Sequence, residues 1–143
     1  MNAQLALDSY RRAGVISEVE NASPHRLVQI LMEKALENLN LAVARFAANQ
    51  LVERRKSVSE AVAFIDALRQ ALTPADESAV SANLEALYSH MIERLLASNI
   101  SNDPSDIRHS AEMMEMIKSA WDELPDAVSA EQANQLREYF DVV

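Results

Sequence analysis

The sequence predicts an all-α protein, an antiparallel up-and-down four-helix bundle, from three observations. Gly14 is the only glycine among 143 residues, which disfavours β-hairpins that need positive φ angles and glycine-rich loops that hold phosphate. All four prolines stand where a helix is expected to begin or end. Between them, apolar residues recur every three or four positions in segments rich in Ala, Leu, Glu, Arg and Met, which favour helices.

The first helix of this bundle is predicted over residues 24–48. Ser23 has the side chain of an N-cap, Pro24 suits the first helical position, and Asn49 suits the C-terminal cap. The apolar residues expected to turn inward repeat at the spacing of one helix face: Leu27, Val28, Leu31, Ala35, Leu36, Leu39, Val43 and Phe46.

Proline pairs separate the remaining helices. Thr73-Pro74 and Asp103-Pro104 each place a capping side chain before a proline suited to the first turn, and Pro125 ends the last pattern. We therefore expect a second helix over residues 53–72, a third that contains residues 83–99, and a fourth over residues 104–124. The second carries Val58, Ala61, Val62, Ile65, Leu68 and Leu72 at interior positions, and the fourth carries Ile107, Ala111, Met114, Ile117, Trp121 and Leu124. Short connections between four such helices imply antiparallel neighbours.

The whole chain, residues 1–143, is expected to form a single helical-bundle domain, in which the four-helix bundle covers residues 23–124 and both ends differ from it. Residues 1–22 mix apolar side chains with charges and are too short to fold alone, so they are predicted to form a mobile N-terminal arm whose apolar side chains pack into a groove. Residues 125–143 form a C-terminal extension. Ser129 and Gln132 have capping-box spacing there, which favours one further short helix.

Composition excludes several classes of function. The formal charge of −9 repels nucleic acid and anionic membranes, and the only basic cluster, Arg54, Arg55 and Lys56, is expected to be a solvated turn. The absence of cysteine excludes disulfides and thiolate metal sites. No segment reads as a secretory signal or a membrane span, so we expect a cytoplasmic protein.

The segment from Asn83 to Asn99, NLEALYSHMIERLLASN, resembles the third helix of the flagellar secretion chaperones, the FliS family. An Asn-Leu pair, a Leu-Tyr pair, a later Leu and a terminal Asn followed by Asp recur in that order in the family. Here they are Asn83-Leu84, Leu87-Tyr88, Leu95, Asn99 and Asp103. The resemblance extends from Tyr10 through Ala22-Ser23-Pro24, Leu27, Ala35-Leu36, Ala61, Ile65 and Leu68 to Trp121, most of the chain.

This resemblance implies a non-enzymatic chaperone without a cofactor or metal. Such a protein binds the disordered C-terminal segment of flagellin, prevents its premature polymerisation and delivers it to the flagellar export apparatus. Recognition would be of the helix-in-groove kind, with the client folding as it binds. The family's arm occupies part of the client groove when the client is absent, a role that falls to Tyr10 here. A homodimer is compatible with the sequence.

The residues predicted to bind the client come from the N-terminal arm, from the first and third predicted helices, and from the methionines of the fourth. Met113 and Met116 cannot face the same core as Met114, and flexible thioethers suit an adaptable client surface. The predicted client-binding residues are Tyr10, Val15, Leu27, Val28, Met32, Leu87, Tyr88, Met91, Leu95, Met113 and Met116. Trp121 is expected to anchor the fourth helix to its neighbours.

Two alternatives come from other classes of helical bundle. A histidine-phosphotransfer bundle needs an exposed histidine on a helix, and His90 and His109 are the candidates. A ferritin-like bundle holds two metal ions with inward Glu and Glu-x-x-His residues. The nearest set in this chain has the reverse order, His before Glu: His90 with Glu93 and His109 with Glu112, accompanied by Glu33 and Glu37.

Overall fold

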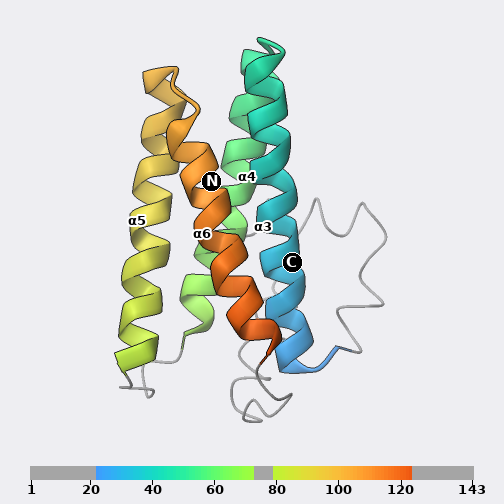
Figure 1. Cartoon of the computed structure of the whole chain (residues 1–143), viewed down its shortest axis with the longest axis vertical. Coiled ribbons are helices and arrows are strands. Elements are labelled where there is room, and N and C mark those ends of the chain that lie inside the picture. Colours follow the sequence, from blue (N-terminus) through green and yellow to red (C-terminus); the bar gives the residue numbers. More distant parts are fainter. Residues whose placement is uncertain (1–21, 73–78, 124–143) are drawn as a thin grey trace.

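The computed structural model describes residues 22–72 and 79–123, which form four α-helices and no strand (Figure 1). The helices are α3 (Pro24–Ala47), α4 (Leu51–Ala71), α5 (Ala79–Ser101) and α6 (Ser105–Asp122). Each runs antiparallel to the next along the chain, and together they enclose one hydrophobic core. The prediction of an all-α four-helix bundle is confirmed.

Helix α3 begins with the predicted cap. Ser23 has an extended backbone, and its hydroxyl accepts a hydrogen bond of 3.1 Å from the backbone N–H of Arg26. Pro24 occupies the first helical position, where its missing N–H leaves no intrahelical bond unmade. The beginning of α3 is therefore fixed by the two residues that the sequence analysis singled out.

The end of α3 is a Schellman motif centred on Asn49. Asn49 has φ of 57°, in the left-handed region that Gly and Asn tolerate best. Its N–H donates to the carbonyl of Phe46 at 3.1 Å, and the N–H of Gln50 donates to the carbonyl of Arg45 at 2.9 Å. These two bonds satisfy carbonyls that the helix end leaves open, and α4 begins immediately afterwards, two residues before its predicted start.

A second left-handed asparagine, Asn102 with φ of 55°, follows the end of α5. The Asp103 carboxylate then accepts a 2.9 Å hydrogen bond from the N–H of Ser105. That bond is the main cause that holds the pKa of Asp103 below its usual value. α6 thus starts one residue later than expected: Pro104 stands at the N-cap position that was predicted for Asp103, and Asp103 bonds the first helical N–H from the residue before it.

The core is built from the apolar stripes of all four helices. α3 packs against α4 and α6, and α4 packs against α5. The core includes most of the predicted interior residues. The buried ones are Leu27, Leu31, Ala35, Leu39, Val58, Ala61, Ile65, Leu68, Ile107 and Met114. Those that are partly buried and pack against them are Val28, Leu36, Val43, Phe46, Val62, Leu72, Ala111, Ile117 and Trp121.

One residue of the basic cluster is not solvated. Arg54 is only 4% exposed, its guanidinium carbon lies 4.7 Å from the centre of the Phe46 ring, and Nη1 donates to Oδ1 of Asn102 at 3.2 Å. The expectation of a solvated turn was wrong for Arg54, because this side chain joins the α3–α4 turn to the α5–α6 turn. Arg55 and Lys56 are exposed as expected.

Several predictions concern residues outside the described ranges. These are the arm with Tyr10 and Val15, the cap at Thr73 and Pro74, the stop at Pro125 and the short helix after Ser129. The division into arm, bundle and extension stays a prediction. Among residues 22–72 and 79–123, no helix is both long and apolar enough to cross a membrane.

Candidate functional site

The sides of α5 and α6 that face each other are identified by an ion pair near the turn that joins them. Nε of Arg94 on α5 lies 2.7 Å from Oδ1 of Asp106 on α6. Residues one or two helical turns from this pair on each helix therefore lie on the same facing sides.

Leu87 and Met113 lie two turns from that ion pair. Leu87 precedes Arg94 by seven residues and Met113 follows Asp106 by seven, so each returns to about the same side of its helix after roughly 700° of rotation. Since the helices are antiparallel, the two side chains stand at similar heights. Both are partly buried. Leu87 and Met113 therefore mark the centre of an apolar surface, contributed partly by α5 and partly by α6.

Neighbours at helical spacing extend this surface. Leu84 lies one turn before Leu87, and Met116 and Ile117 lie one turn after Met113. Leu84 and Ile117 are partly buried, whereas Met116 is 73% exposed. In Figure 1, α6 tilts away from α5 toward the beginning of α3, so the two helices diverge along this stretch. We call Leu84, Leu87, Met113, Met116 and Ile117 the α5–α6 face.

The structure divides the predicted client-binding residues by burial. Those at the centre of the core are Leu27, Met32, Tyr88, Met91 and Leu95, those at its edge are Val28 and Met113, and Leu87 is partly buried outside this core cluster. Met116 is exposed, and Tyr10 and Val15 lie outside the described residues. Leu84 and Ile117 were not among the predicted client-binding residues; both pack partly buried against the core, and they also share the stripes of Leu87 and Met113.

Tyr88 shows how completely the inner side of α5 is covered. Its side chain is 2% exposed, and burial raises the pKa of its hydroxyl above the ordinary value near 10. A client could touch this ring only after a movement of the bundle.

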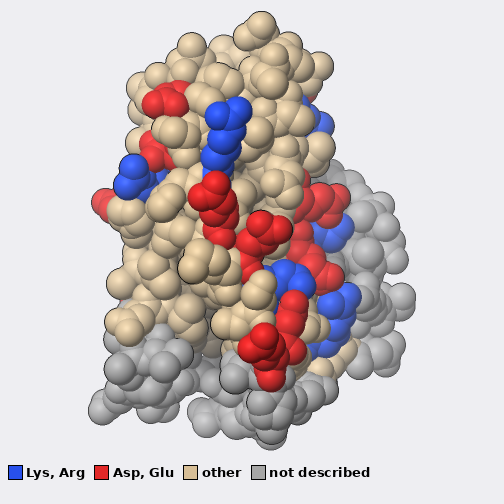
Figure 2. Space-filling view, in the orientation of Figure 1, with Lys and Arg blue, Asp and Glu red and all other residues tan. Residues whose placement is uncertain are grey.

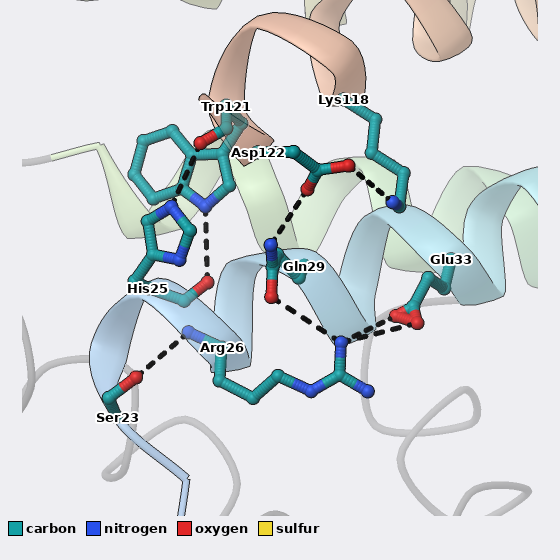
Figure 3. Close-up of polar contacts among 8 residues, drawn as sticks. All are labelled: Ser23, His25, Arg26, Gln29, Glu33, Lys118, Trp121 and Asp122. Atoms are coloured by element: carbon teal, nitrogen blue, oxygen red, sulfur yellow. Dashed lines mark hydrogen bonds and ion pairs between the residues drawn. The ribbon is translucent and has the colours of Figure 1, made fainter. Parts of the chain in front are cut away.

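The far end of α6 is fastened to the beginning of α3 by His25 and Trp121 (Figure 3). Nε2 of His25 donates to the carbonyl of Trp121 at 2.8 Å, and Nε1 of Trp121 donates to the carbonyl of His25 at 3.1 Å. The two rings stack with centroids 5.1 Å apart and an interplanar angle of 13°. The expected anchoring role of Trp121 is confirmed.

A polar group beside this pair adds a second link between the same helices. Nε2 of Gln29 donates to Oδ1 of Asp122 at 2.7 Å, and the Lys118 ammonium lies 2.7 Å from Oδ2 of the same carboxylate (Figure 3). The bond from Lys118, and then the bond from Gln29, hold the pKa of Asp122 below its usual value. The C-terminal half of α6 is thus attached to α3 rather than to α5.

Charged side chains surround these contacts. Figure 2 shows them concentrated over the middle and lower parts of α6 and α3, with acidic and basic groups side by side, and sparse toward the upper end of this face. Arg26 and Glu33, 2.9 Å apart on α3, are one such pair. A ligand on the α5–α6 face would therefore meet apolar side chains beside a polar rim.

The residues of the two alternative functions lie on the surface. His90, Glu93, His109 and Glu112 are all exposed and so do not project into the bundle as ferritin-like ligands would. Within residues 22–72 and 79–123, no three His, Asp or Glu side chains gather closely enough to hold a metal ion. Nε2 of His90 lies 3.4 Å from Nη1 of Arg94, beside the ion pair with Asp106.

Comparison with known proteins places this bundle in a family. Residues 6–128 match the family described as flagellar protein FliS. The chain is 34% identical to the flagellar secretion chaperone FliSB of Pseudomonas aeruginosa over 122 residues, which cover 85% of this chain and 97% of that protein. It is 32% identical to the flagellar secretion chaperone FliS of Vibrio cholerae over 120 residues, 84% of this chain and 88% of that one. It is 29% identical to FliS of Salmonella typhimurium over 128 residues, 89% and 95% of the two chains. Because the family match covers most of the chain, the relatives are this similar and the fold is a helical bundle, the chain belongs to the FliS family of flagellar proteins.

Proposed function

We propose that this protein is a chaperone that binds the disordered C-terminal segment of flagellin, keeps it from polymerising and delivers it to the flagellar export apparatus. The observation that carries the proposal is the family match over residues 6–128, together with relatives that are named flagellar secretion chaperones. The bundle adds a surface of suitable chemistry, because partly exposed Leu and Met side chains line the α5–α6 face.

The α5–α6 face suits a helix that folds as it binds. An amphipathic client helix would cover Leu87 and Met113 with its apolar stripe and leave its polar side toward the charged rim. Met113 and Met116 add flexible side chains that adjust to the shape of the client. Ordering of the client costs conformational entropy, which limits affinity and makes release to a competing partner possible without bond chemistry.

The buried part of the predicted site supports this face from beneath. Tyr88, Met91 and Leu95 bury the inner side of α5 in the core, and Leu87 on the same helix stays partly exposed. We further propose that the N-terminal arm, with Tyr10 and Val15, competes with the client for an apolar surface of the bundle.

The test measures binding to flagellin, to its C-terminal segment and to flagellin lacking that segment. We expect the first two to bind and the third not to bind. Met116→Ser and Met113→Ser should each weaken binding, by roughly tenfold for residues near the centre of an interface. Leu41→Ser is the matched control: Leu41 is 39% exposed and lies one turn before Arg45, whose side chain reaches α4.

Equal binding to complete and truncated flagellin, or binding to neither, would remove the proposed function. Binding that survives both methionine substitutions would leave the function in place and move the client to another surface. The two failures are therefore distinguishable. Circular dichroism of each variant shows whether the bundle is intact.

A further inference from the structure

Exposed apolar side chains gather at one end of the bundle, where α4 begins and α5 ends. Six large apolar side chains are exposed among the residues whose burial is described, and four of them lie there: Leu51, Val52, Leu96 and Ile100. Val52 is 76% exposed and Ile100 is 87% exposed. Single exposed apolar residues are ordinary, but a group of them marks an interaction surface.

One hydrogen bond between the helices brings these side chains together. Nη2 of Arg55 on α4 donates to the carbonyl of Asn99 on α5 at 3.2 Å. Val52 lies one turn before Arg55, Leu96 lies one turn before Asn99, and Ile100 follows Asn99 directly. We call Val52, Arg55, Lys56, Leu96 and Ile100 the α4–α5 end surface.

Buried contacts hold this surface in place. Arg54 lies beneath it, bonded to Asn102 after α5 and stacked over Phe46 of α3. Asn99 and Asn102 therefore both connect the end of α5 to the beginning of α4. A surface that is already ordered loses little entropy when a partner binds.

The charge of this surface is opposite to that of the whole protein. Arg55 and Lys56 are exposed beside Val52, in a chain whose formal charge is −9. The N-terminus of α4 adds partial positive charge at the same end. Two exposed acidic residues border this surface, Glu53 in the first turn of α4 and Glu93 one turn before Leu96. Arg54, Arg55 and Lys56 together outweigh the charge of Glu53, so the beginning of α4 is net positive. Apolar side chains bordered by Arg and Lys complement an apolar stripe bordered by Asp and Glu.

This surface is separate from the α5–α6 face. Leu96 follows Leu87 by nine residues, about 900° of rotation, so the two leucines lie on opposite sides of α5. The contacts of α5 agree, since Arg94 reaches α6 whereas Asn99 and Ser89 receive bonds from α4. A protein bound to one side leaves the other side open.

We propose that the α4–α5 end surface docks an amphipathic helix of a second partner protein, one whose apolar stripe is bordered by acidic residues. This partner binds at the same time as a client on the α5–α6 face. Val52, Leu96 and Ile100 contact its apolar stripe, and Arg55 and Lys56 pair with its acidic border. The protein is then an adaptor with two docking surfaces.

The test uses two designed 18-residue helical peptides with the same leucine stripe, one bordered by glutamates and the other by lysines. At low salt, where exposed charges are weakly screened, we expect the glutamate peptide to bind at least tenfold more tightly. General attraction to a chain of charge −9 would give the reverse order. Fluorescence anisotropy of labelled peptides measures both affinities.

Substitutions place the peptide on the molecule. Ile100→Ser and Lys56→Glu should each weaken binding of the glutamate peptide by about tenfold. Met116 belongs to α6 and to the α5–α6 face, and its exposure is similar to that of Ile100. Met116→Ser should therefore leave the affinity for the glutamate peptide unchanged. Equal affinity for the two peptides, or unchanged binding by Ile100→Ser, overturns the proposal.

Two further outcomes also overturn it and identify another occupant. Displacement of the glutamate peptide by the C-terminal segment of flagellin would assign the surface to the client. Sedimentation that shows a dimer, and a monomer for Ile100→Ser, would assign it to a second copy of this chain. Because the peptides contain no flagellin sequence, their binding is measured whether or not the proposed chaperone function holds.

Discussion

Individual side chains fix the ends of α6, and each does so through the main chain. His25 and Trp121 donate to each other's backbone carbonyls, so each ring is held by the residue that it stacks on. Asp103 accepts from the N–H of Ser105 at the other end of the helix. The contribution of each contact can be measured with a conservative substitution. One such substitution keeps an aromatic ring and removes its hydrogen-bond donor, and the other keeps the shape of the acid and removes its charge.

Replacing Trp121 by Phe removes the indole N–H and keeps an aromatic ring against His25. We expect a loss of about 1 kcal/mol in the free energy of unfolding, the usual net value of one hydrogen bond. Trp121→Ala also removes the packed ring and should cost roughly 3–5 kcal/mol. Urea unfolding followed by far-ultraviolet circular dichroism measures both, and Met116→Leu is the exposed control. Equal stability of Trp121→Phe and the parent protein would contradict the importance of this bond.

The pKa of Asp103 predicts an acid-dependent weakening at the beginning of α6. Because that pKa is lowered in the folded protein, the stabilisation is complete above the ordinary value of about 3.9 and is lost as the pH falls through the lower, folded pKa. The amide resonance of Ser105 should shift with this titration. Asp103→Asn keeps an accepting oxygen without a titrating group, so its Ser105 resonance should show no such step.

The helical elements follow from capping residues that are visible in the sequence. Ser23 occupies its predicted N-cap, Asn49 stands one residue past the C-cap of α3, and Asp103 stands one residue before the N-cap of α6. The observed bounds differ from the expected ones by no more than two residues at these positions. Local hydrogen bonding decides these positions, so local sequence suffices to find them. The start of α4 was less well predicted, because Gln50 makes no side-chain cap bond there.

The left-handed turn at Asn49 gives a test at this scale. Asn49→Ala should reduce the free energy of unfolding by about 1–2 kcal/mol, because a Cβ without a compensating polar group disfavours φ near 57°. Asn49→Gly should leave stability unchanged or increase it, since glycine accepts that angle freely. Thermal unfolding orders the three proteins, and an alanine variant as stable as the glycine variant would be inconsistent with this explanation.

The candidate site was harder to predict than the helices, since core and surface use the same residue types. Leu87 and Leu95 share one stripe of α5, yet the first is partly buried and the second is fully buried. No local pattern distinguishes these two positions. Leu96 and Ile100 did carry a signal: they lie off the stripe of Leu84, Tyr88, Met91 and Leu95, so they had no place in the core.

At the scale of the whole molecule, polar contacts attach α6 to its neighbours at both ends, and Ala111, Met114 and Ile117 pack against the core between them. The ion pair of Arg94 and Asp106 holds one end to α5, and His25 with Trp121 holds the other end to α3. The α5–α6 face lies along the intervening stretch. A client that inserts there would therefore press on the helix where side chains, and not caps, determine its position.

Deleting residues 1–15 tests the proposed competition between arm and client. We expect greater binding of a hydrophobic dye by the free protein and a higher affinity for the flagellin segment, because an apolar surface loses an internal competitor. Replacement of Tyr10 and Val15 by serine within the complete chain is the matched control and should change both quantities in the same direction. Unchanged dye binding together with unchanged affinity would exclude the arm from this role.

The contact between α3 and α6 at His25 and Trp121 also provides an intrinsic fluorescence probe. Trp121 is the only tryptophan of the chain, so all indole emission originates where its ring stacks on His25. A change in the distance between the two rings alters the surroundings of the indole and therefore its emission. Stopped-flow fluorescence of the unlabelled protein would then time the arrival of flagellin by any shift of α6 that it causes.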